Sequence, residues 1–376
     1  MKVLHILNEL KFSGAEIMYV DAAPFFQEKG CELSVMATAN EVGEYAPYFE
    51  QAGYQVYHYP MPSLKKYANR IKFYSQIIKF LKKEKFNVVH IHSSASMWGF
   101  AFCAWLTNTK SVYTFHNVFP THFYTYPYHV LLRWSAKYIF RCKFQTISDS
   151  VYNNEAILYH NTTTKIYNWY GNKRYYPATL EEKNNIRKNL GIEPNALVVI
   201  SVGGCSTVKR HSDIIQALPL VLEKIPNTIY LHLGKGVTEE DEKKLAITLG
   251  VEEKVWFCNN QQFVRDYLIA SDIYLMPSRF EGIPITTIEA MACAIPAILY
   301  DVPGLRDFNK EGENSLLIPE DYKILAEKII YIHKNPLIAS LISEAARNFV
   351  NQNFNMHKNV DKIFELYTTE STNETN

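Results

Sequence analysis

Residues 273–298 read IYLMPSRFEGIPITTIEAMACAIPAI, and this stretch decides the fold of the C-terminal half of the chain. The apolar run at 273–276 has the composition of a buried parallel strand, and another apolar run closes the stretch. Between them, Gly282 and Pro284 mark a tight turn and a helix start, so a helix is predicted over 285–293. Strand, helix and strand in this order are typical of a parallel sheet with helical crossovers.

The same alternation extends outward through nearly the whole chain. It is interrupted at 168–190, where Gly171 and Pro177 fall, and a linker is predicted at 171–177. We expect two Rossmann-like α/β domains, over 1–170 and 171–351, with helices at about 352–368 packing back on the first domain and a polar tail at 369–376. Strands are predicted at 2–7, 32–37, 55–59, 88–91, 111–115, 144–147, 164–167, 197–202, 228–233, 254–257, 273–276 and 297–299.

The composition is that of a globular protein, with 47% hydrophobic and 20% charged residues. The net charge of +1 gives no sign of a nucleic-acid partner. The six cysteines are far apart and show no close zinc or redox spacing, so free thiols in a reducing compartment are expected. No apolar run is long enough for a signal peptide or a membrane span, and a cytoplasmic location is expected.

An anion site is predicted where the helix at 285–293 begins. The free backbone N–H groups of its first turn and the helix dipole favour a negative charge, and a diphosphate is the obvious candidate. Glu281 and Glu289, with seven residues between them, offer carboxylate acceptors for sugar or ribose hydroxyls. The alternative is that Glu281 caps the helix electrostatically and Glu289 is a solvated helix acid.

This segment resembles the donor-binding signature of glycosyltransferase family 4, S-x-x-E-G-x-P-x-x-x-x-E-A-M-A. The string matches at Ser278, Glu281, Gly282, Pro284, Glu289, Ala290, Met291 and Ala292. The resemblance implies a GT-B fold, in which two Rossmann-like domains face each other across a cleft. It also implies that Glu281 contacts the transferred sugar and that Glu289 holds the ribose of the nucleotide. The backbone that meets the diphosphate would belong to Gly282, Ile283, Pro284, Ile285 and Thr286.

A second segment, SVGGCSTVKRHSDIIQAL at 201–218, is similar to the family's V-G-R-x-x-x-x-K-G stretch, whose Arg and Lys neutralise the donor diphosphate. Lys209 matches the Lys, and Gly203 matches the first glycine. Gly204 stands where the family has Arg, and Arg210 stands where it has Gly. Our hypothesis is that Arg210 supplies the missing charge from the adjacent position. The alternative is that Lys209 and Arg210 only solvate a helix start.

Three further residues are implied by the resemblance. Gly234, which ends the strand in IYLHLGKG, would let the backbone approach the nucleotide; the alternative is an ordinary strand-to-helix turn. Gly14 lies in a loop similar to the family's G-G-A-E loop and is expected to contact a phosphate or the acceptor. His116, in YTFHNVF, resembles the histidine that the family places near the transferred sugar. His116, like His92, could instead be a satisfied buried polar group.

The expected reaction is transfer of a sugar from a UDP- or GDP-sugar with retention of configuration, and Glu281, His116 and Lys209 form the catalytic set. No D-x-D or H-E-x-x-H motif occurs, so no metal and no cofactor are expected. Basic side chains and helix dipoles would then stabilise the leaving diphosphate. Front-face attack is expected, with Glu281 positioning the sugar without attacking it.

Charge is unevenly distributed along the chain. Residues 60–145 contain thirteen Lys and Arg and a single acid, Glu84. The stretches 65–86 and 126–144 combine these cations with aromatic and aliphatic residues, a pattern that suits an anionic membrane surface. We therefore expect peripheral membrane attachment and a saccharide acceptor, lipid-linked, in bacterial surface polysaccharide synthesis. The alternative is that the apolar residues face the core and the lysines form a solvated face.

The sequence pattern leaves other functions as alternatives. A non-catalytic sugar-nucleotide-binding scaffold is favoured only by the missing Arg at Gly204. An epimerase or a phosphorylase would share the fold, but no pyridoxal-lysine motif is evident. An NAD-dependent dehydrogenase is poorly supported, because no G-x-G-x-x-G follows the first strand.

Overall fold

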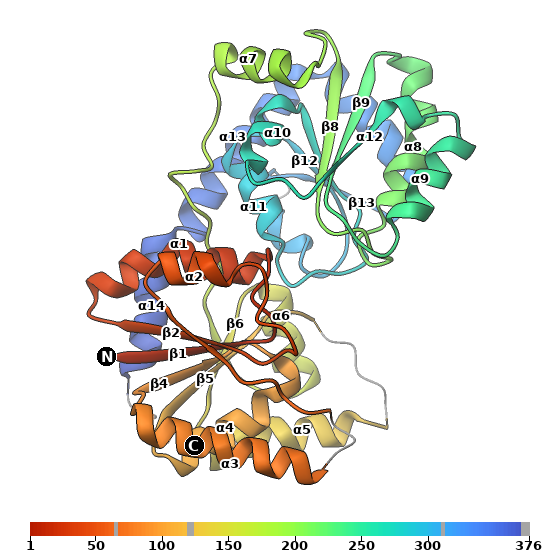
Figure 1. Cartoon of the computed structure of the whole chain (residues 1–376). Helices are drawn as coiled ribbons and strands as arrows, with labels where there is room; N and C mark the ends of the chain where they lie inside the picture. Colours follow the sequence, from red (N-terminus) through yellow and green to blue (C-terminus); the bar gives the residue numbers. More distant parts are fainter. Residues whose placement is uncertain (64–66, 119–123, 310–312, 370–376) are drawn as a thin grey trace. The chain divides into compact units, whose positions relative to one another are not determined.

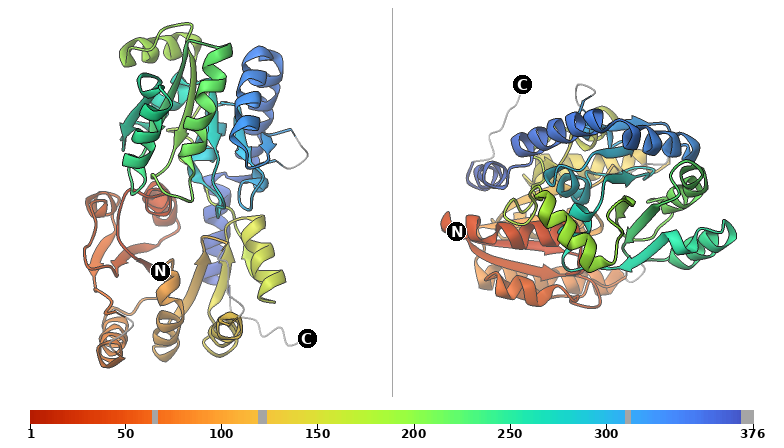
Figure 2. Two further views of the ribbon diagram at one scale, coloured as in Figure 1. Left: turned by 90° about the vertical axis from the view of Figure 1, so that its right-hand side faces the viewer. Right: turned by 90° about the horizontal axis from the view of Figure 1, so that it is seen from above.

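The computed structural model describes residues 1–63, 67–118, 124–309 and 313–369. The chain forms two compact units, one of Met1–Asn168 with Met356–Asn376 (unit 1) and one of Trp169–Asn355 (unit 2). Each unit is built on its own parallel sheet with helices on both faces (Figures 1 and 2). The predicted α/β fold with two Rossmann-like domains is therefore confirmed.

Unit 1 contains a seven-stranded sheet in the order β3-β2-β1-β4-β5-β6-β7. Helices α1 and α14 pack together on one face, and α3 and α4 pack together on the other (Figure 1). Its elements are β1 (Lys2–Leu7), α1 (Gly14–Glu28), β2 (Glu32–Ala37), α2 (Ala46–Gln51), β3 (Gln55–His58), α3 (Tyr67–Glu84), β4 (Val88–Ile91), η1 (Ser94–Ser96), α4 (Met97–Leu106), β5 (Lys110–Phe115), α5 (Tyr126–Trp134), η2 (Ser135–Ile139), β6 (Lys143–Thr146), α6 (Asp149–Asn153), η3 (Asn154–Leu158), β7 (Thr164–Lys165) and α14 (Met356–Thr368).

Unit 2 contains a six-stranded sheet in the order β10-β9-β8-β11-β12-β13. Helices α8, α9 and α12 cover one face, and α10, α11 and α13 cover the other (Figure 1). Its elements are α7 (Leu180–Leu190), β8 (Leu197–Val202), α8 (His211–Lys224), β9 (Thr228–Leu233), α9 (Glu239–Thr248), η4 (Glu252–Lys254), β10 (Val255–Asn259), α10 (Val264–Ala270), β11 (Ile273–Met276), α11 (Ile285–Ala292), β12 (Ala297–Tyr300), η5 (Arg306–Phe308), β13 (Leu316–Ile318), α12 (Tyr322–Lys334) and α13 (Pro336–Asn353).

The sequence did not predict β13. This strand has three residues, two of them only half-buried, and it pairs with β12 at the edge of the sheet. The strand predicted at 164–167 is shorter in the structure, where β7 ends at Lys165. Edge strands carry few apolar residues and are set by pairing, so composition gives little sign of them.

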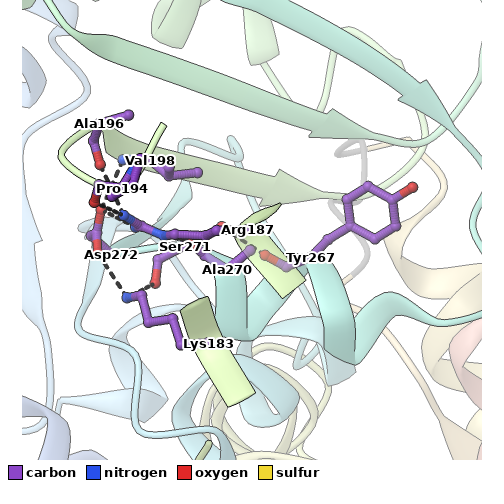
Figure 3. A network of polar contacts seen from close by, with 9 residues as sticks. All are labelled: Lys183, Arg187, Pro194, Ala196, Val198, Tyr267, Ala270, Ser271 and Asp272. Atoms are coloured by element: carbon purple, nitrogen blue, oxygen red, sulfur yellow. Dashed lines mark hydrogen bonds and ion pairs between the residues drawn. The ribbon is translucent and has the colours of Figure 1, made fainter. Parts of the chain in front are cut away.

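Asp272, just before β11, ties helix α7 to the sheet of unit 2 (Figure 3). Its carboxylate accepts hydrogen bonds from Lys183 at 2.8 Å, from Arg187 at 2.7 Å and from the backbone N–H of Val198 at 2.9 Å. Burial alone would raise the pKa of Asp272, but the Lys183 and Arg187 charges outweigh it and hold the pKa below its usual value. This network fixes the starting ends of β8 and β11, whose carboxyl ends carry the candidate site.

Candidate active site

The loops after β8 and β9 pack backbone against backbone. Gly203 donates its N–H to Leu233 at 2.8 Å. Gly234 has φ of +143°, and a Cβ there would lie 2.0 Å from the carbonyl oxygen of Gly203. Only glycine therefore fits at 234. The strand-to-helix turn expected at this position packs directly against the backbone of the loop after β8.

The turn between β11 and α11 is held between two other loops. The N–H of Arg279 donates to Val208 at 2.8 Å, and the N–H of Glu281 donates to Pro303 at 3.0 Å. Gly304 has φ of +84°, and a Cβ there would lie 2.2 Å from the Glu281 carbonyl oxygen. These contacts fix the backbone of Glu281 at the carboxyl end of β11, next to the loop that carries Lys209.

Lys209 and Glu281 form an ion pair, with Nζ 2.7 Å from Oε1. The two side chains are 22% and 13% exposed, so the pair is shielded but open to a ligand. The structure thus brings together the two residues of unit 2 that the sequence placed in the catalytic set. A carboxylate at this distance orients the ammonium group without removing its charge.

Helix α11 begins beside this pair, with Pro284 in an extended conformation as its N-cap. Within the described residues, no side chain caps its first turn. Thr286 donates from Oγ1 to the carbonyl oxygen of Val202 at 3.1 Å, which joins the helix start to the end of β8. Glu289 is 7% exposed, so it is not a solvated helix acid. The predicted segment from Gly282 to Thr286 therefore forms a helix N-terminus at the carboxyl ends of β8 and β11, where an anion is favoured.

Arg210 takes the left-handed conformation, with φ of +52°, and is the N-cap of α8. This explains why the family pattern has Gly at that position. Its guanidinium binds Asp213 at 2.7 Å, binds Glu320, and lies 5.3 Å from the ring centre of Tyr300. The charge of Arg210 is thus shared by two carboxylates, and its role as a diphosphate cation remains a prediction.

Gly204 and Arg279 complete the surroundings of Lys209. A Cβ on Gly204 would lie 3.1 Å from the carbonyl oxygen of Lys235, so a larger residue there requires a small shift of the next loop. Arg279, which sequence reasoning missed, lines a polar pocket of about 430 Å³ together with Ser206, Thr207 and Arg210. Its position between the serine and the glutamate of the family signature was the only available signal.

In unit 1, Gly14 begins helix α1. The hydroxyl of Ser13 donates to the carboxylate of Glu16, which is buried. Burial raises the pKa of Glu16, and the Ser13 hydrogen bond partly opposes that effect. Ser13 thus replaces the family's first glycine with a residue that orders the first turn of α1, while the expected ligand contact of Gly14 remains a prediction.

His116 follows β5 and belongs to a chain of three histidine rings in unit 1. Its Nε2 lies 3.0 Å from Nδ1 of His92, and Nε2 of His92 lies 3.1 Å from Nδ1 of His5. Burial lowers the pKa of His116 to about 4 and that of His5 to about 3, so both rings are neutral near pH 7. Sequence reasoning missed His5, because only the parallel register of β1, β4 and β5 aligns the three rings.

These features define a two-domain GT-B glycosyltransferase. Family comparison agrees: the model for Glycosyltransferase Family 4 matches residues 12–152, and that for Glycosyl transferases group 1 matches residues 182–356. The chain belongs to this family of glycosyltransferases, as the resemblance predicted.

Named relatives are bacterial enzymes. The chain is 24% identical to the N-acetyl-alpha-D-glucosaminyl L-malate synthase of Bacillus anthracis, over 84% of this chain and 81% of that protein. It is 22% identical to the UDP-Gal:alpha-D-GlcNAc-diphosphoundecaprenol alpha-1,3-galactosyltransferase of Escherichia coli. That similarity covers 98% of this chain and 96% of the Escherichia coli protein.

Solved structures share the fold. Anabaena Alr3699/HepE in complex with UDP and glucose has a TM-score of 0.82 at 19% identity, over 98% of this chain and all of that one. WaaG, a glycosyltransferase involved in lipopolysaccharide biosynthesis, has a TM-score of 0.74 at 17% identity. The superposition covers 98% of this chain and 100% of the WaaG chain.

Proposed function

We propose that this glycosyltransferase moves a sugar from a UDP-sugar to a lipid-linked saccharide, with retention of configuration and without a metal at the diphosphate. The Lys209–Glu281 pair beside the N-terminus of α11 carries this proposal. The choice of UDP over GDP rests on the bound UDP of the Anabaena structure and on the name of the Escherichia coli relative. A role in bacterial surface polysaccharide synthesis is proposed on the same ground.

The proposed step breaks the bond between the anomeric carbon and the donor phosphate oxygen. The acceptor oxygen attacks from the same face, and the leaving phosphate oxygen takes its proton. The ammonium of Lys209 and the backbone N–H groups at the start of α11 stabilise the diphosphate as its charge grows. Glu281 holds Lys209 in place and accepts a hydrogen bond from the sugar, while Glu289 accepts one from the ribose.

The acceptor is proposed to bind unit 1 at a membrane surface. Leu131, Trp134 and Tyr138, on α5 and η2, are between 51% and 60% exposed. Within the described residues, no helix is both long and apolar enough to span a bilayer. Exposed aromatic and aliphatic side chains near lysines support peripheral attachment to the inner face of the plasma membrane instead.

Two details revise the expected membrane surface. Arg133, which the sequence grouped with these aromatics, is buried and binds Glu155, so it does not contribute. On α3, Phe73 and Ile77 face the core and so cannot contact a membrane, whereas Ile71 is exposed and can. Residues 65 and 66, which begin the expected stretch at 65–86, lie outside the described residues.

A donor screen tests the proposal. Thermal shifts measured with UDP-, GDP- and ADP-sugars are expected to show stabilisation by a UDP-sugar, and NMR of the product is expected to show the donor's anomeric configuration. Turnover is expected not to rise when Mg²⁺ or Mn²⁺ is added to the assay, because no metal is proposed at the diphosphate. An inverted product contradicts the retaining mechanism, and stabilisation by no nucleotide-sugar contradicts the function.

A non-catalytic scaffold is the second candidate, because Gly204 replaces the family's arginine. The two proposals differ in one measurement, the slow hydrolysis of the donor in the absence of acceptor. Hydrolysis that is lost in Lys209→Ala supports an enzyme. Donor binding with no hydrolysis and no transfer to any saccharide supports a scaffold.

A further inference from the structure

Four side chains with metal-binding atoms converge in the interior of unit 2. They are Cys205 after β8, His211 at the start of α8, His232 on β9 and Glu242 on α9, each at most 4% exposed. One ligand atom from each residue (the thiol sulfur, a ring nitrogen of each histidine and a carboxylate oxygen) lies within 4.8 Å of the other three. The four residues are dispersed over 205–242, so the sequence shows no close zinc-like spacing.

We propose that Cys205, His211, His232 and Glu242 bind one divalent transition-metal ion, with zinc as the best match. Thiolate, imidazole and carboxylate are the ligands that tetrahedral zinc takes in proteins. The site would be structural, since all four positions come from the chain and none is open to solvent. This proposal is independent of the proposed function.

The distances suit one shared ion. Nε2 of His232 lies 2.8 Å from Nδ1 of His211, 3.4 Å from Oε2 of Glu242 and 3.7 Å from Sγ of Cys205. Metal bonds of about 2.0–2.3 Å place tetrahedral ligand atoms roughly 3.3–3.8 Å apart. The two histidine nitrogens would therefore separate slightly, and Oε2 of Glu242, 3.9 Å from Nδ1 of His211, would move slightly closer.

A hydrogen-bond network explains the cluster less well than an ion. Nε2 of His232 can form one well-aligned hydrogen bond, as donor or as acceptor, yet three polar atoms lie around it: Nδ1 of His211, Oε2 of Glu242 and Sγ of Cys205. Oε2 of Glu242 accepts no hydrogen bond within the described part of the chain, although Oε1 accepts one from Thr238 at 2.7 Å. The neighbouring cation, Lys243, turns to Glu239 and Glu240 instead. A buried carboxylate without a cation is costly, and a bound ion would satisfy all four atoms together.

The position of the cluster suggests what the ion would do. Cys205 and His211 stand on either side of Lys209 in the loop between β8 and α8. An ion bound to both, and to β9 and α9, would hold the two ends of this loop in place. The absence of a D-x-D motif concerns a metal at the sugar diphosphate and does not bear on this site.

A second cluster, of His5, His90 and His92 in unit 1, carries no such proposal. Both ring nitrogens of His90 already have partners at 2.6 Å, the hydroxyls of Tyr367 and Thr114. This cluster also lacks a thiol, so a thiolate-to-metal signal distinguishes the two.

The test is a cobalt(II) titration of the full chain after removal of metal with a chelator under reducing conditions. We expect about one equivalent to bind with a thiolate-to-cobalt charge-transfer band and the intense visible bands of tetrahedral cobalt, and zinc to displace it. The matched variants are Cys205→Ser, which should lose the charge-transfer band, and Cys258→Ser, the half-exposed thiol of β10, which should keep it. Coordination would displace the Cys205 thiol proton to solvent.

Glu242→Gln provides a second variant of nearly unchanged volume, in case Cys205→Ser does not fold. It should keep the charge-transfer band but bind cobalt at least about tenfold more weakly. A wild-type chain that shows no charge-transfer band, or a band that survives Cys205→Ser, overturns the proposal. So does equal cobalt affinity in Glu242→Gln and the wild type.

Discussion

Lys209 and Glu281, 72 positions apart in the sequence, meet with Nζ 2.7 Å from Oε1. Each comes from the loop that follows a neighbouring strand of the same parallel sheet, β8 for Lys209 and β11 for Glu281. The contact places a fixed cation and an oriented carboxylate beside the start of α11. It is the feature of unit 2 that most closely links the fold to the proposed chemistry.

Lys209→Ala is expected to weaken binding of the UDP-sugar. The variant removes a charge-assisted contact to the diphosphate and leaves Glu281 as an unpaired negative charge near the donor. A loss of about 1–3 kcal/mol, or roughly fivefold to 150-fold in Kd, is expected from calorimetry. Lys224→Ala, an exposed lysine in the last turn of α8, is the control and should bind normally. Equal binding by both variants would remove Lys209 from the site.

Arg210→Gly and Arg210→Ala separate the backbone of this residue from its charge. Both remove the contacts to Asp213 and Tyr300, but only alanine must hold φ of +52°. Arg210→Ala should therefore be less stable than Arg210→Gly by about 1 kcal/mol in chemical denaturation. If the guanidinium is committed to its carboxylates, both variants lose less donor affinity than Lys209→Ala. A donor loss as large as that of Lys209→Ala would instead establish Arg210 as the missing diphosphate cation.

Glu155→Gln is expected to destabilise unit 1. Glu155 is buried and accepts hydrogen bonds from Nε and Nη2 of Arg133 at 2.7 and 2.8 Å. Removing its charge leaves a buried guanidinium without a counterion, at a cost of about 3–5 kcal/mol in the free energy of unfolding. Lys83→Met, which breaks an exposed pair with Glu84, should change this free energy by less than about 1 kcal/mol. A small effect of Glu155→Gln would show that water reaches the pair.

The histidine chain predicts a loss of stability in acid. The pKa is about 4 for His116 and about 3 for His5 in the folded chain, against 6.5 for an ordinary histidine. Below pH 6.5 the unfolded state therefore binds more protons than the folded state. The contribution of these histidines to the free energy of unfolding is complete above pH 6.5 and is lost as the pH falls towards 4 and 3. His116→Gln should flatten the dependence of urea unfolding on pH by up to about 1.4 kcal/mol per pH unit. The exposed His58, changed to Gln, should leave the slope as it is.

The exposed aromatics of unit 1 should bind anionic vesicles. Trp134→Ser with Tyr138→Ser removes apolar surface from α5 and η2, and flotation with phosphatidylglycerol vesicles at low salt should fall several-fold. Tyr331→Ser, an exposed tyrosine on α12, is the matched control and should float like the wild type. High salt should also weaken binding, because the lysines contribute electrostatically. A wild-type chain that does not float ends the membrane proposal.

The sequence by itself determined the α/β class, most strand positions and the family, because buried parallel strands are apolar runs and the glutamate signature is contiguous. Strands at 2–7, 197–202 and 273–276 lie where they were predicted. The short edge strand β13 was missed, because pairing with β12 defines it and composition does not.

Tertiary structure alone decided which distant side chains meet. The Lys209–Glu281 pair, the alignment of His5 with His92, and the convergence of Cys205 with His232 depend on strand order and register. A one-dimensional pattern records periodicity along one segment, whereas these contacts join strands and loops whose proximity is fixed only when the parallel sheets form.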